Sequence, residues 1–343
     1  MEWSDFFPPR SRVLALPGWD SPRLYFSAGP ALHRWRCSGF FPGWRAAARA
    51  ARMVLKLKAV LLPGPARSVD SPDWTLGAFV KDIFPDACSV VLQVNPRNAA
   101  GKFVAQLRDP RCRVLGYVKY GQSVMAQERL RNEYTLLNAL PPDTGPAPLT
   151  FGELDKGAAL CLSAVRGKHV PPALDPPAAV GGFLGNLPSS DPLPLHAHPW
   201  IAAVRSEGSR GIERWLEPLA SRDWPTVLQH GDFAPWNLIR VADNSLRALD
   251  WEYGCTEGFP YLDIAYYLLQ VGLLVKGYSS GVAVEEAVHH LCAGNVLEAL
   301  PEDMARSITA LAAYEQYTKS AEDGHNPNTP VQRSRLAIWK GET

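Results

Sequence analysis

Short apolar segments separated by polar turns dominate the middle of the chain. Runs of four to eight residues, rich in β-branched and aromatic side chains and bounded by turn residues, are typical of strands. Such runs occur at 12–16, 23–26, 89–94, 102–107, 114–120, 149–154 and 158–165. One longer segment, Ser123 to Leu140, has apolar positions at helical spacing and lies between the runs at 114–120 and 149–154. The pattern predicts antiparallel strands with one inserted helix.

Longer apolar stripes with a helical repeat characterise the second half. Prolines cluster between Pro141 and Pro199, which favours loops there. The segments predicted as helices are 201–219, 264–275, 285–300 and 302–321. Together the two halves predict an α+β protein whose helices lie mainly toward the C-terminus.

A basic segment with an apolar stripe precedes these strands. From Trp44 to Leu62 the chain carries five cationic residues and no acid, and Met53, Val54 and Leu57 fall on one helical face. A basic amphipathic helix of this kind is compatible with lying on an anionic membrane surface. The alternatives are an ordinary helix packed on its neighbours with the basic face in water, and a helix that contacts a partner protein.

Composition narrows the class of protein. Among 343 residues, 35 Lys and Arg balance 34 Asp and Glu, so no global charge points to nucleic acid. No run approaches the roughly 20 apolar residues of a spanning helix, and no secretory signal is evident. The six cysteines form no CxxC pair and show no histidine at zinc spacing, which indicates reduced structural thiols. We expect a cytoplasmic protein, with peripheral contact to the inner face of the membrane as an alternative.

One stretch, Leu228 to Gly254, carries the candidate chemistry. It contains His230-Gly231-Asp232, then Asn237, and then Asp250-Trp251-Glu252 after a short apolar run. Two carboxylates and an amide oxygen beside brief strands suit hard oxygen-ligated cations and a hydroxyl that loses a proton. The alternative is a hairpin with polar turn residues. The joint spacing HGDxxxxN and LDWE favours the functional interpretation.

A second candidate pair follows from helical facing. Lys119 lies late on the 114–120 segment, and the next predicted helix contains Glu128 and Glu133. Glu133 shares the apolar stripe of that helix, whereas Glu128 projects toward solvent. Because an acid on a buried face needs a cation, we expect Lys119 to pair with Glu133.

These residues resemble the motifs of the aminoglycoside phosphotransferase and choline kinase family, a branch of the protein-kinase-like fold. The HGD sequence stands where protein kinases carry HRD, and DWE stands where they carry DFG. The resemblance implies that Asp232 is the catalytic carboxylate and that Asn237 and Asp250 hold Mg²⁺. It also implies that Asp263 anchors the HGD loop, a supporting role that extends to His230.

The resemblance further implies ATP as the phosphoryl donor, bound through a second set of residues. Lys119 would bind its phosphates, oriented by Glu133, while the hinge backbone near Ser163 and Val165 would meet the adenine. The turn at 95–101 would cover the phosphates, although a plain hairpin turn explains that segment as well.

The implied architecture is bilobal. A five-stranded antiparallel small lobe at 73–165 would precede a mainly helical, acceptor-binding large lobe at 166–343, and residues 1–72 would form an N-terminal extension.

The acceptor is a weaker inference. Residues 168–225 mix six acids with several arginines, so they do not form the acidic bowl that a polycationic aminoglycoside requires. A hydroxyl of a small molecule, a sugar or a lipid-linked glycan is favoured, and the basic segment adds weight to a membrane-associated acceptor. The alternatives are a non-catalytic nucleotide-binding scaffold and an aminoglycoside phosphotransferase. A protein kinase is disfavoured by HGD and by the short connection between Glu252 and Gly258. The oligomeric state stays open.

Overall fold

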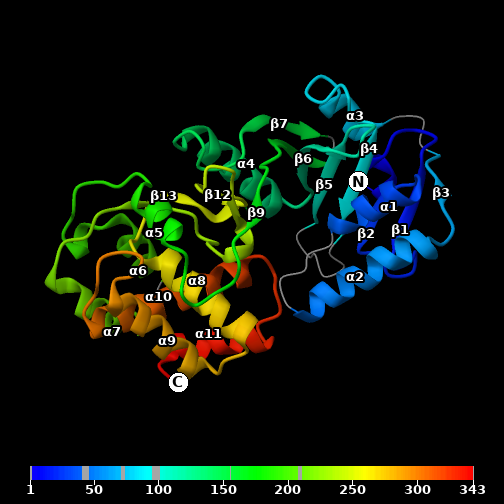
Figure 1. Cartoon of the computed structure of the whole chain (residues 1–343). Coiled ribbons are helices and arrows are strands. Elements are labelled where there is room, and N and C mark those ends of the chain that lie inside the picture. The colour runs from blue at the N-terminus through cyan, green and yellow to red at the C-terminus, as the bar shows by residue number, and fades with distance from the viewer. Residues whose placement is uncertain are drawn as a thin grey trace. The chain divides into compact units, whose positions relative to one another are not determined.

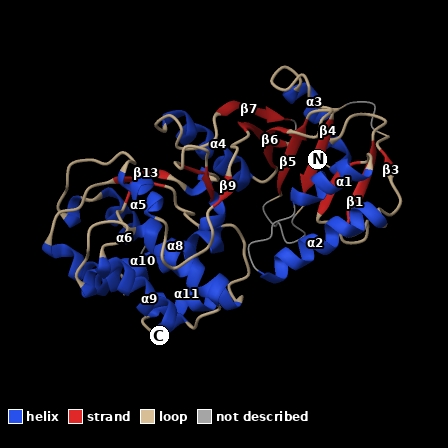
Figure 2. Cartoon of the chain, in the orientation of Figure 1, coloured by secondary structure: helices blue, strands red, loops and turns tan. Residues whose placement is uncertain are grey.

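The computed structural model describes residues 2–40, 46–70, 74–94, 101–154, 156–207 and 211–342. The chain divides into two compact units (Figures 1 and 2). We call the first, Met1–Tyr134 with Pro146–Ala164, the sheet unit, and the second, Thr135–Gly145 with Val165–Thr343, the helical unit. This is the α+β organisation that the hydrophobic pattern predicted.

The sheet unit is built on one eight-stranded sheet in the order β3-β1-β2-β4-β5-β6-β8-β7. All of its pairings are antiparallel. The strands are β1 Arg12–Leu16, β2 Leu24–Ser27, β3 Arg67–Ser68, β4 Ser89–Gln93, β5 Lys102–Arg108, β6 Val114–Gly121, β7 Pro148–Leu154 and β8 Gly157–Ser163. Every predicted strand in this unit is present within one or two residues.

The sheet has three strands more than the five predicted. The five expected strands, β4 to β8, are extended by β1, β2 and β3 from the first 72 residues. β2 pairs with β4 from Leu24↔Gln93 to Phe26↔Val91. This pairing covers backbone groups of β4 that would otherwise form an open sheet edge. Residues 12–27 are therefore an integral part of the sheet.

Alternating side chains of β1 enter two different hydrophobic clusters. Val13 and Ala15 belong to a cluster with Phe6 and Leu76. Leu14 and Leu16 belong to a second cluster, which contains Cys37, Ala59 and Cys112. Because successive side chains of a strand point to opposite faces, the sheet is buried on both faces here. The helices of this unit are α1 Ala31–Cys37, α2 Ala46–Leu61, α3 Thr75–Val80 and the first part of α4 Val124–Ala139.

Helix α2 corresponds to the predicted basic segment, of which residues 44 and 45 lie outside the described part of the chain. Ala59 is buried, but Met53, Val54, Leu57 and Leu61 are 47–71% exposed. The apolar stripe therefore does not face the core of the sheet unit.

The helical unit contains seven α-helices among its described residues. They are α5 Ala178–Gly185, α6 Pro199–Ser206, α7 Glu213–Leu216, α8 Leu262–Gln270, α9 Ser280–Ala293, α10 Glu302–Glu322 and α11 Pro330–Lys340. The predicted helix 201–219 is wrong as a single element: α6 ends at Ser206, and a separate short helix begins at Glu213. The predicted helix 264–275 is α8, prolonged by a π-helical turn at Val271–Lys276.

Short strands complete this unit and carry the candidate site. β10 Val227–Gln229 pairs with β13 Cys255–Gly258, and β9 Lys168–His169, β11 Leu238–Arg240 and β12 Leu246–Ala248 form a second small sheet. Within the described ranges, no helix is both long and apolar enough to span a bilayer.

Candidate functional site

The HGD loop follows β10 and is held by a carboxylate from helix α8. The backbone N–H groups of His230 and Gly231 donate to Asp263 Oδ2 and Oδ1 at 2.7 and 2.9 Å. Gly231 has φ +76°, and a Cβ there would lie 2.3 Å from the carbonyl oxygen of Tyr253. Only glycine readily adopts this φ and also leaves room for the Tyr253 carbonyl oxygen, so the HGD turn requires glycine at position 231.

His230 joins the HGD loop to the segment that precedes Asp250. Its Nδ1 accepts the backbone N–H of Asp232 at 3.2 Å, and its Nε2 lies 2.8 Å from the carbonyl oxygen of Leu249. Since Nδ1 accepts and a carbonyl can only accept, the proton resides on Nε2 and the ring is neutral. His230 thereby ties the backbone of Asp232 to the residue before Asp250.

The carboxylate of Asp232 is oriented by two side chains. Tyr266 Oη donates to Oδ1 at 2.6 Å, and Asn237 Nδ2 donates to Oδ2 at 3.0 Å and to the Asp232 carbonyl at 2.9 Å. Gln270 in turn donates to the Tyr266 hydroxyl. Burial raises the pKa of Asp232 to about 6, opposed by the Tyr266 hydrogen bond and reinforced by the charges of Asp250 and Glu252. Three acids therefore lie within electrostatic range of each other in this unit.

Asp250 occupies the turn between β12 and a 3₁₀ helix at Trp251–Tyr253. It has φ +71°, a left-handed conformation that is uncommon for a residue with a side chain. Leu249 N–H donates to the carbonyl of Asn237 at 2.7 Å, so the backbone links the two predicted metal ligands. Non-glycine residues in strained conformations concentrate at functional sites, which agrees with the role inferred for this motif.

The donor set fits a hard divalent cation. Asn237 uses its Nδ2 for both bonds to Asp232, and this orientation leaves the amide oxygen as the atom with which a cation would bind. Mg²⁺ prefers carboxylate, amide oxygen and water ligands, the types that Asp250 and Asn237 supply. Burial is the main cause of the raised pKa of Asp232, and such a cation would offset the smaller contribution from the charges of Asp250 and Glu252.

The predicted ion pair of Lys119 and Glu133 is present in the sheet unit. Lys119 Nζ lies 2.7 Å from both carboxylate oxygens of Glu133. The side chain of Glu133 is fully buried and that of Lys119 is 16% exposed, whereas Glu128 is exposed. β6 supplies the lysine and α4 the glutamate, as helical facing indicated. Its role in binding nucleotide stays a prediction.

The predicted hinge residues lie at the end of β8 and just beyond it. Ser163 N–H donates to the carbonyl of Ala147 at 2.9 Å, and Ser163 Oγ accepts the N–H of Ala147 at 2.8 Å. A bond from Ser163 to adenine would thus involve its carbonyl group. Val165 begins the second segment of the helical unit. Most of the predicted phosphate turn, residues 95–100, lies outside the described residues.

Two residues near Asp232 were missed by the sequence analysis. Asp263, Tyr266 and Gln270 are separated by three and four positions in α8, so they share one face of an otherwise apolar helix. The first contacts the HGD loop and the second contacts Asp232 itself. The signal that could have identified Tyr266 and Gln270 was this polar repeat within a buried helix.

A cavity of about 290 Å³ in the helical unit does not coincide with this site. It is lined by residues of β10, α5 and the start of α8, among them Leu184, Phe259, Tyr261 and Glu298. Asp263 also lines this cavity, but neither Asp232 nor Asp250 contributes. We therefore do not assign the cavity to phosphoryl transfer.

Comparisons with known proteins agree with the motif. Residues 185–285 match the model of the phosphotransferase enzyme family APH, a segment that includes the HGD loop, Asn237, Asp250 and Asp263. The resemblance inferred from the sequence is thereby confirmed for this part of the chain. A search of curated proteins finds no match.

Solved structures with similar chains carry related descriptions. One is a thermostable mutant of aminoglycoside phosphotransferase APH(4)-Ia in ternary complex with AMP-PNP and hygromycin B (TM-score 0.48, 14% identity, 78% of this chain and 98% of that chain). Another is Plasmodium vivax ethanolamine kinase (TM-score 0.48, 12% identity, 85% and 93%). A third is a putative fructosamine-3-kinase from Haemophilus somnus (TM-score 0.45, 12% identity, 77% and 96%). All three scores are below 0.5, so the site rests on its own geometry and on the family match.

Proposed function

We propose that this protein is an ATP-dependent phosphotransferase that moves the γ-phosphate to a hydroxyl group of a small molecule, a sugar or a lipid-linked glycan. The observation that carries the proposal is the orientation of Asp232. Two donors, Tyr266 and Asn237, hold its carboxylate, and the HGD backbone that bears it is fixed by Asp263. Such fixation is what a carboxylate needs in order to position an acceptor hydroxyl.

In the proposed reaction Asp232 accepts a hydrogen bond from the acceptor hydroxyl and takes its proton. The new oxygen–phosphorus bond forms as the bond between the γ-phosphorus and the β–γ bridging oxygen of ATP breaks, and ADP leaves. Lys119, oriented by Glu133, binds the α- and β-phosphates of ATP. Because phosphoryl transfer passes through a loose transition state, placement of the reactants supplies most of the acceleration.

Asn237 and Asp250 would hold Mg²⁺. When bound, Mg²⁺ supplies positive charge that neutralises the phosphate oxygens. The fixed amide orientation of Asn237 and the left-handed turn at Asp250 support this assignment.

Pairing among the acids of the helical unit supports a neutral acceptor. Glu213 accepts two hydrogen bonds from Arg205, and Glu207 accepts one from the Tyr314 hydroxyl. Acids that already have partners contribute less to a surface for a polycation such as an aminoglycoside.

The exposed stripe of α2 supports a membrane-associated acceptor as the finer form of the proposal. Val54, Leu57 and Leu61 are exposed on a helix whose charged residues are all cationic. A basic helix with an exposed apolar stripe binds anionic bilayers by burying that stripe. Deleting residues 1–65 is an unsuitable test because the deletion would remove β1 and β2 from the sheet.

The membrane hypothesis is tested by replacing Val54, Leu57 and Leu61 with serine in the full chain. Flotation with vesicles that contain phosphatidylserine should recover the wild-type protein, and the triple variant should stay in the dense fraction. Vesicles of phosphatidylcholine alone are the control for charge. A wild-type protein that fails to float with anionic vesicles would remove the membrane contact and leave the phosphotransferase proposal untouched.

The phosphotransferase proposal is tested with a pooled panel of hydroxyl metabolites, sugars, amino alcohols and aminoglycosides. The protein is incubated with Mg²⁺ and ATP, and products are detected by the mass increase of one phosphoryl group. Wild-type protein should phosphorylate a compound that Asp232→Asn leaves unmodified. Asp243→Asn is the matched control, because Asp243 is an exposed acid in the β11–β12 turn whose side chain accepts hydrogen bonds from the backbone and hydroxyl of Ser245.

Each other outcome has a distinct meaning in this assay. ATP binding without any product across the panel would favour the non-catalytic scaffold. Phosphorylation confined to aminoglycosides would favour the drug-modifying alternative. Equal turnover by Asp232→Asn and wild type would contradict the mechanism.

A further inference from the structure

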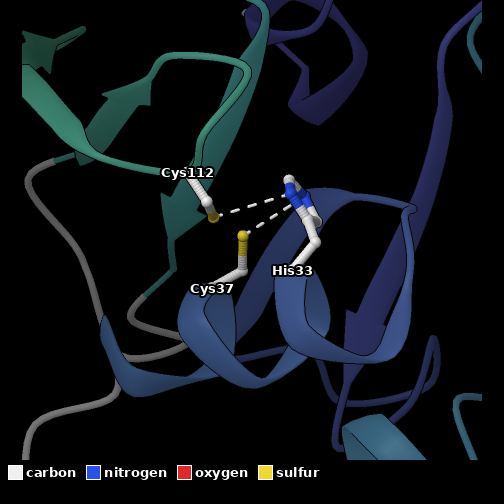
Figure 3. A group of neighbouring side chains, drawn as sticks. All are labelled: His33, Cys37 and Cys112. Carbon is white, nitrogen blue, oxygen red and sulfur yellow. Dashed lines mark hydrogen bonds between the residues drawn. The ribbon is translucent and has the colours of Figure 1, made fainter.

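The sheet unit contains a cluster of one histidine and two cysteines that the proposed reaction does not use. His33 and Cys37 lie on α1, and Cys112 lies in the turn between β5 and β6 (Figure 3). One ligand atom from each of the three residues lies within 4.8 Å of the others. We propose that His33, Cys37 and Cys112 form a binding site for a thiophilic metal ion of the Zn²⁺ or Cu⁺ type.

The expectation that no histidine stands at zinc spacing is therefore wrong. His33 and Cys37 are four positions apart, so they lie on the same face of α1. The third residue is far away in the sequence and joins them only because β4 and β5 bring the 109–113 turn to this helix. All six cysteines are free thiols, as predicted, but two of them, Cys37 and Cys112, converge on His33.

The Cys112 thiol already lies at metal-site distance from the histidine. Cys112 Sγ lies 3.5 Å from His33 Nδ1, whereas Cys37 Sγ lies 3.4 Å from the other ring nitrogen, Nε2. With Zn–S of about 2.3 Å and Zn–N of about 2.0 Å, a tetrahedral edge between sulfur and nitrogen is about 3.5 Å. The distance between Cys112 Sγ and His33 Nδ1 equals this edge, and rotation of the Cys37 side chain toward Nδ1 would place all three donors around one ion.

The histidine is held in the tautomer that a metal ligand needs. His33 Nε2 lies 2.9 Å from the carbonyl oxygen of Ser27, and a carbonyl can only accept a hydrogen bond. The proton of the neutral ring thus resides on Nε2, and Nδ1 offers its lone pair beside Cys112. A histidine that binds metal through one nitrogen and donates from the other to a backbone carbonyl is the usual arrangement in such sites.

Cys112 is presented by a strained turn. Its φ is +61°, a left-handed conformation that glycine or asparagine adopts more readily than cysteine. The turn is closed by Asp109, whose Oδ1 accepts the N–H of Arg113 and whose carbonyl accepts the N–H of Cys112, both at 2.8 Å. Packing of a small apolar residue does not require a cysteine in this conformation, whereas directing a thiol at His33 does.

A buried arginine beside the cluster favours the thiolate forms of its two cysteines. Arg108 is 7% exposed and donates to Gln106 Oε1, to the carbonyl oxygens of Cys112 and Arg36, and to Cys112 Sγ at 3.5 Å. None of these partners within the described residues is a carboxylate. A buried guanidinium needs negative charge nearby. Two metal-bound thiolates would supply it, and thiolates rather than thiols are what Zn²⁺ and Cu⁺ bind.

The two ions make different demands on the same ligands. Three ligands suffice for a trigonal Cu⁺ site, and two thiolates leave that complex with one negative charge opposite Arg108. Zn²⁺ would need a fourth donor such as water. In either case the ion would fix α1 to the β5–β6 turn on one face of the sheet.

The test uses the full chain, purified under reducing conditions without oxygen. Co²⁺ serves as the spectroscopic probe for Zn²⁺, and Cu⁺ is offered in parallel against a competing chelator. We expect one ion per chain, a thiolate-to-cobalt charge-transfer absorption, and its loss when Zn²⁺ or Cu⁺ displaces cobalt. The ion that binds more tightly identifies the metal. Absence of binding by all three ions would overturn the proposal.

Variants locate the site. Cys37→Ser and Cys112→Ser should each weaken binding by at least about 100-fold, because replacing even an outer-shell partner costs roughly 10–100-fold. Cys161→Ser is the matched control, since Cys161 is equally buried in β8 but lies outside the cluster. Undiminished binding by the Cys37→Ser/Cys112→Ser double variant would mean an adventitious ion elsewhere and would overturn the assignment.

If the variants fail to fold, a second measurement on the wild-type protein tests the site. X-ray absorption of the metal-loaded wild-type protein should show two sulfur ligands and one imidazole nitrogen. A shell of oxygen and nitrogen alone would contradict the site. A chain whose mass under non-reducing conditions is lower by two hydrogens, with no bound metal, would show that the two cysteines form a disulfide instead.

Discussion

Two buried carboxylates, Glu133 in the sheet unit and Asp263 in the helical unit, fix the two sets of candidate residues by different means. Glu133 faces a full opposite charge, with Lys119 Nζ at 2.7 Å from each oxygen. Asp263 faces two backbone N–H groups, those of His230 and Gly231, at 2.7 and 2.9 Å. Glu133 is neutralised by the charge of a side chain, whereas Asp263 is stabilised by hydrogen bonds from the backbone of the HGD loop.

The difference decides what each acid can position. An ion pair fixes the end of a long flexible side chain, and Lys119 gains a defined place for its ammonium group. A carboxylate bonded to consecutive amides fixes the backbone, and so sets the path of the chain into Asp232. The same type of side chain, a carboxylate, thus orients a lysine side chain in one unit and a backbone turn in the other.

The largest loss of stability should come from breaking the ion pair of Lys119 and Glu133. Glu133→Ala removes the buried carboxylate that is bonded to Lys119, and we expect a loss of about 3–5 kcal/mol in the free energy of unfolding. Urea denaturation measures this loss. Glu128→Ala on the exposed face of the same helix is the control and should change stability by less than about 0.5 kcal/mol. Equal effects of the two variants would mean that the pair does not stabilise the sheet unit.

Removing the carboxylate of Asp263, which accepts hydrogen bonds from two backbone N–H groups, should lower the stability by a smaller amount. Asp263→Ala leaves two buried N–H groups without their acceptor, which we expect to lower the free energy of unfolding by about 2–3 kcal/mol. Turnover should fall further than stability does, because the HGD loop loses its anchor. A variant that remains folded with wild-type turnover would show that Asp263 does not position Asp232.

The pH dependence of stability provides a separate test of Asp263. Burial raises the pKa of Asp263 to about 7 from an ordinary value near 3.8, opposed by its two N–H donors. The native state therefore binds the proton more tightly than the unfolded state, and stability falls as pH rises from about 4 to about 7. Asp263→Asn has no such proton. The stability of the wild type relative to Asp263→Asn should decrease over this interval, and an increase would contradict the shift.

The smallest effect is expected at Tyr266. Tyr266→Phe removes one of the two donors to Asp232 and keeps the packing, so stability should change by about 1 kcal/mol. We expect roughly a tenfold loss in kcat with little change in KM for ATP. Tyr267→Phe is the control, because the adjacent ring packs near Phe233 instead. A loss shared by both variants would indicate a general disturbance of α8.

These contrasts also explain what the sequence could reveal. Glu133 was assigned from helical facing because a buried acid demands a cation, and the only partner needed was one lysine on a neighbouring strand. The strands from β4 to β8 were located because alternation and turn residues are local signals. HGDxxxxN and DWE were identifiable because several residue types recur at fixed spacing.

Features that depend on partners far apart in the chain do not follow from local patterns. Every residue except proline carries a backbone N–H group, so neither spacing nor composition marks His230 and Gly231 as the donors to Asp263. Only the family resemblance implied that Asp263 anchors the HGD loop. The addition of β1, β2 and β3 to the sheet depends on which strand edge is left open, and the His33, Cys37 and Cys112 cluster depends on the same long-range pairing. The break in the predicted 201–219 helix shows that apolar spacing alone does not fix where a helix ends.

The most direct test of the account removes the ion pair without leaving a buried charge. Lys119→Met/Glu133→Leu replaces the pair by apolar side chains, an exchange that is often neutral for stability. With Mg²⁺ and ATP, ADP formation in the presence of the identified acceptor is compared between this variant and the wild type, after thermal unfolding has shown that both are folded. We predict a folded variant whose turnover is at least about 100-fold lower. A folded variant with wild-type turnover would contradict the claim that Lys119 and Asp232 serve one reaction.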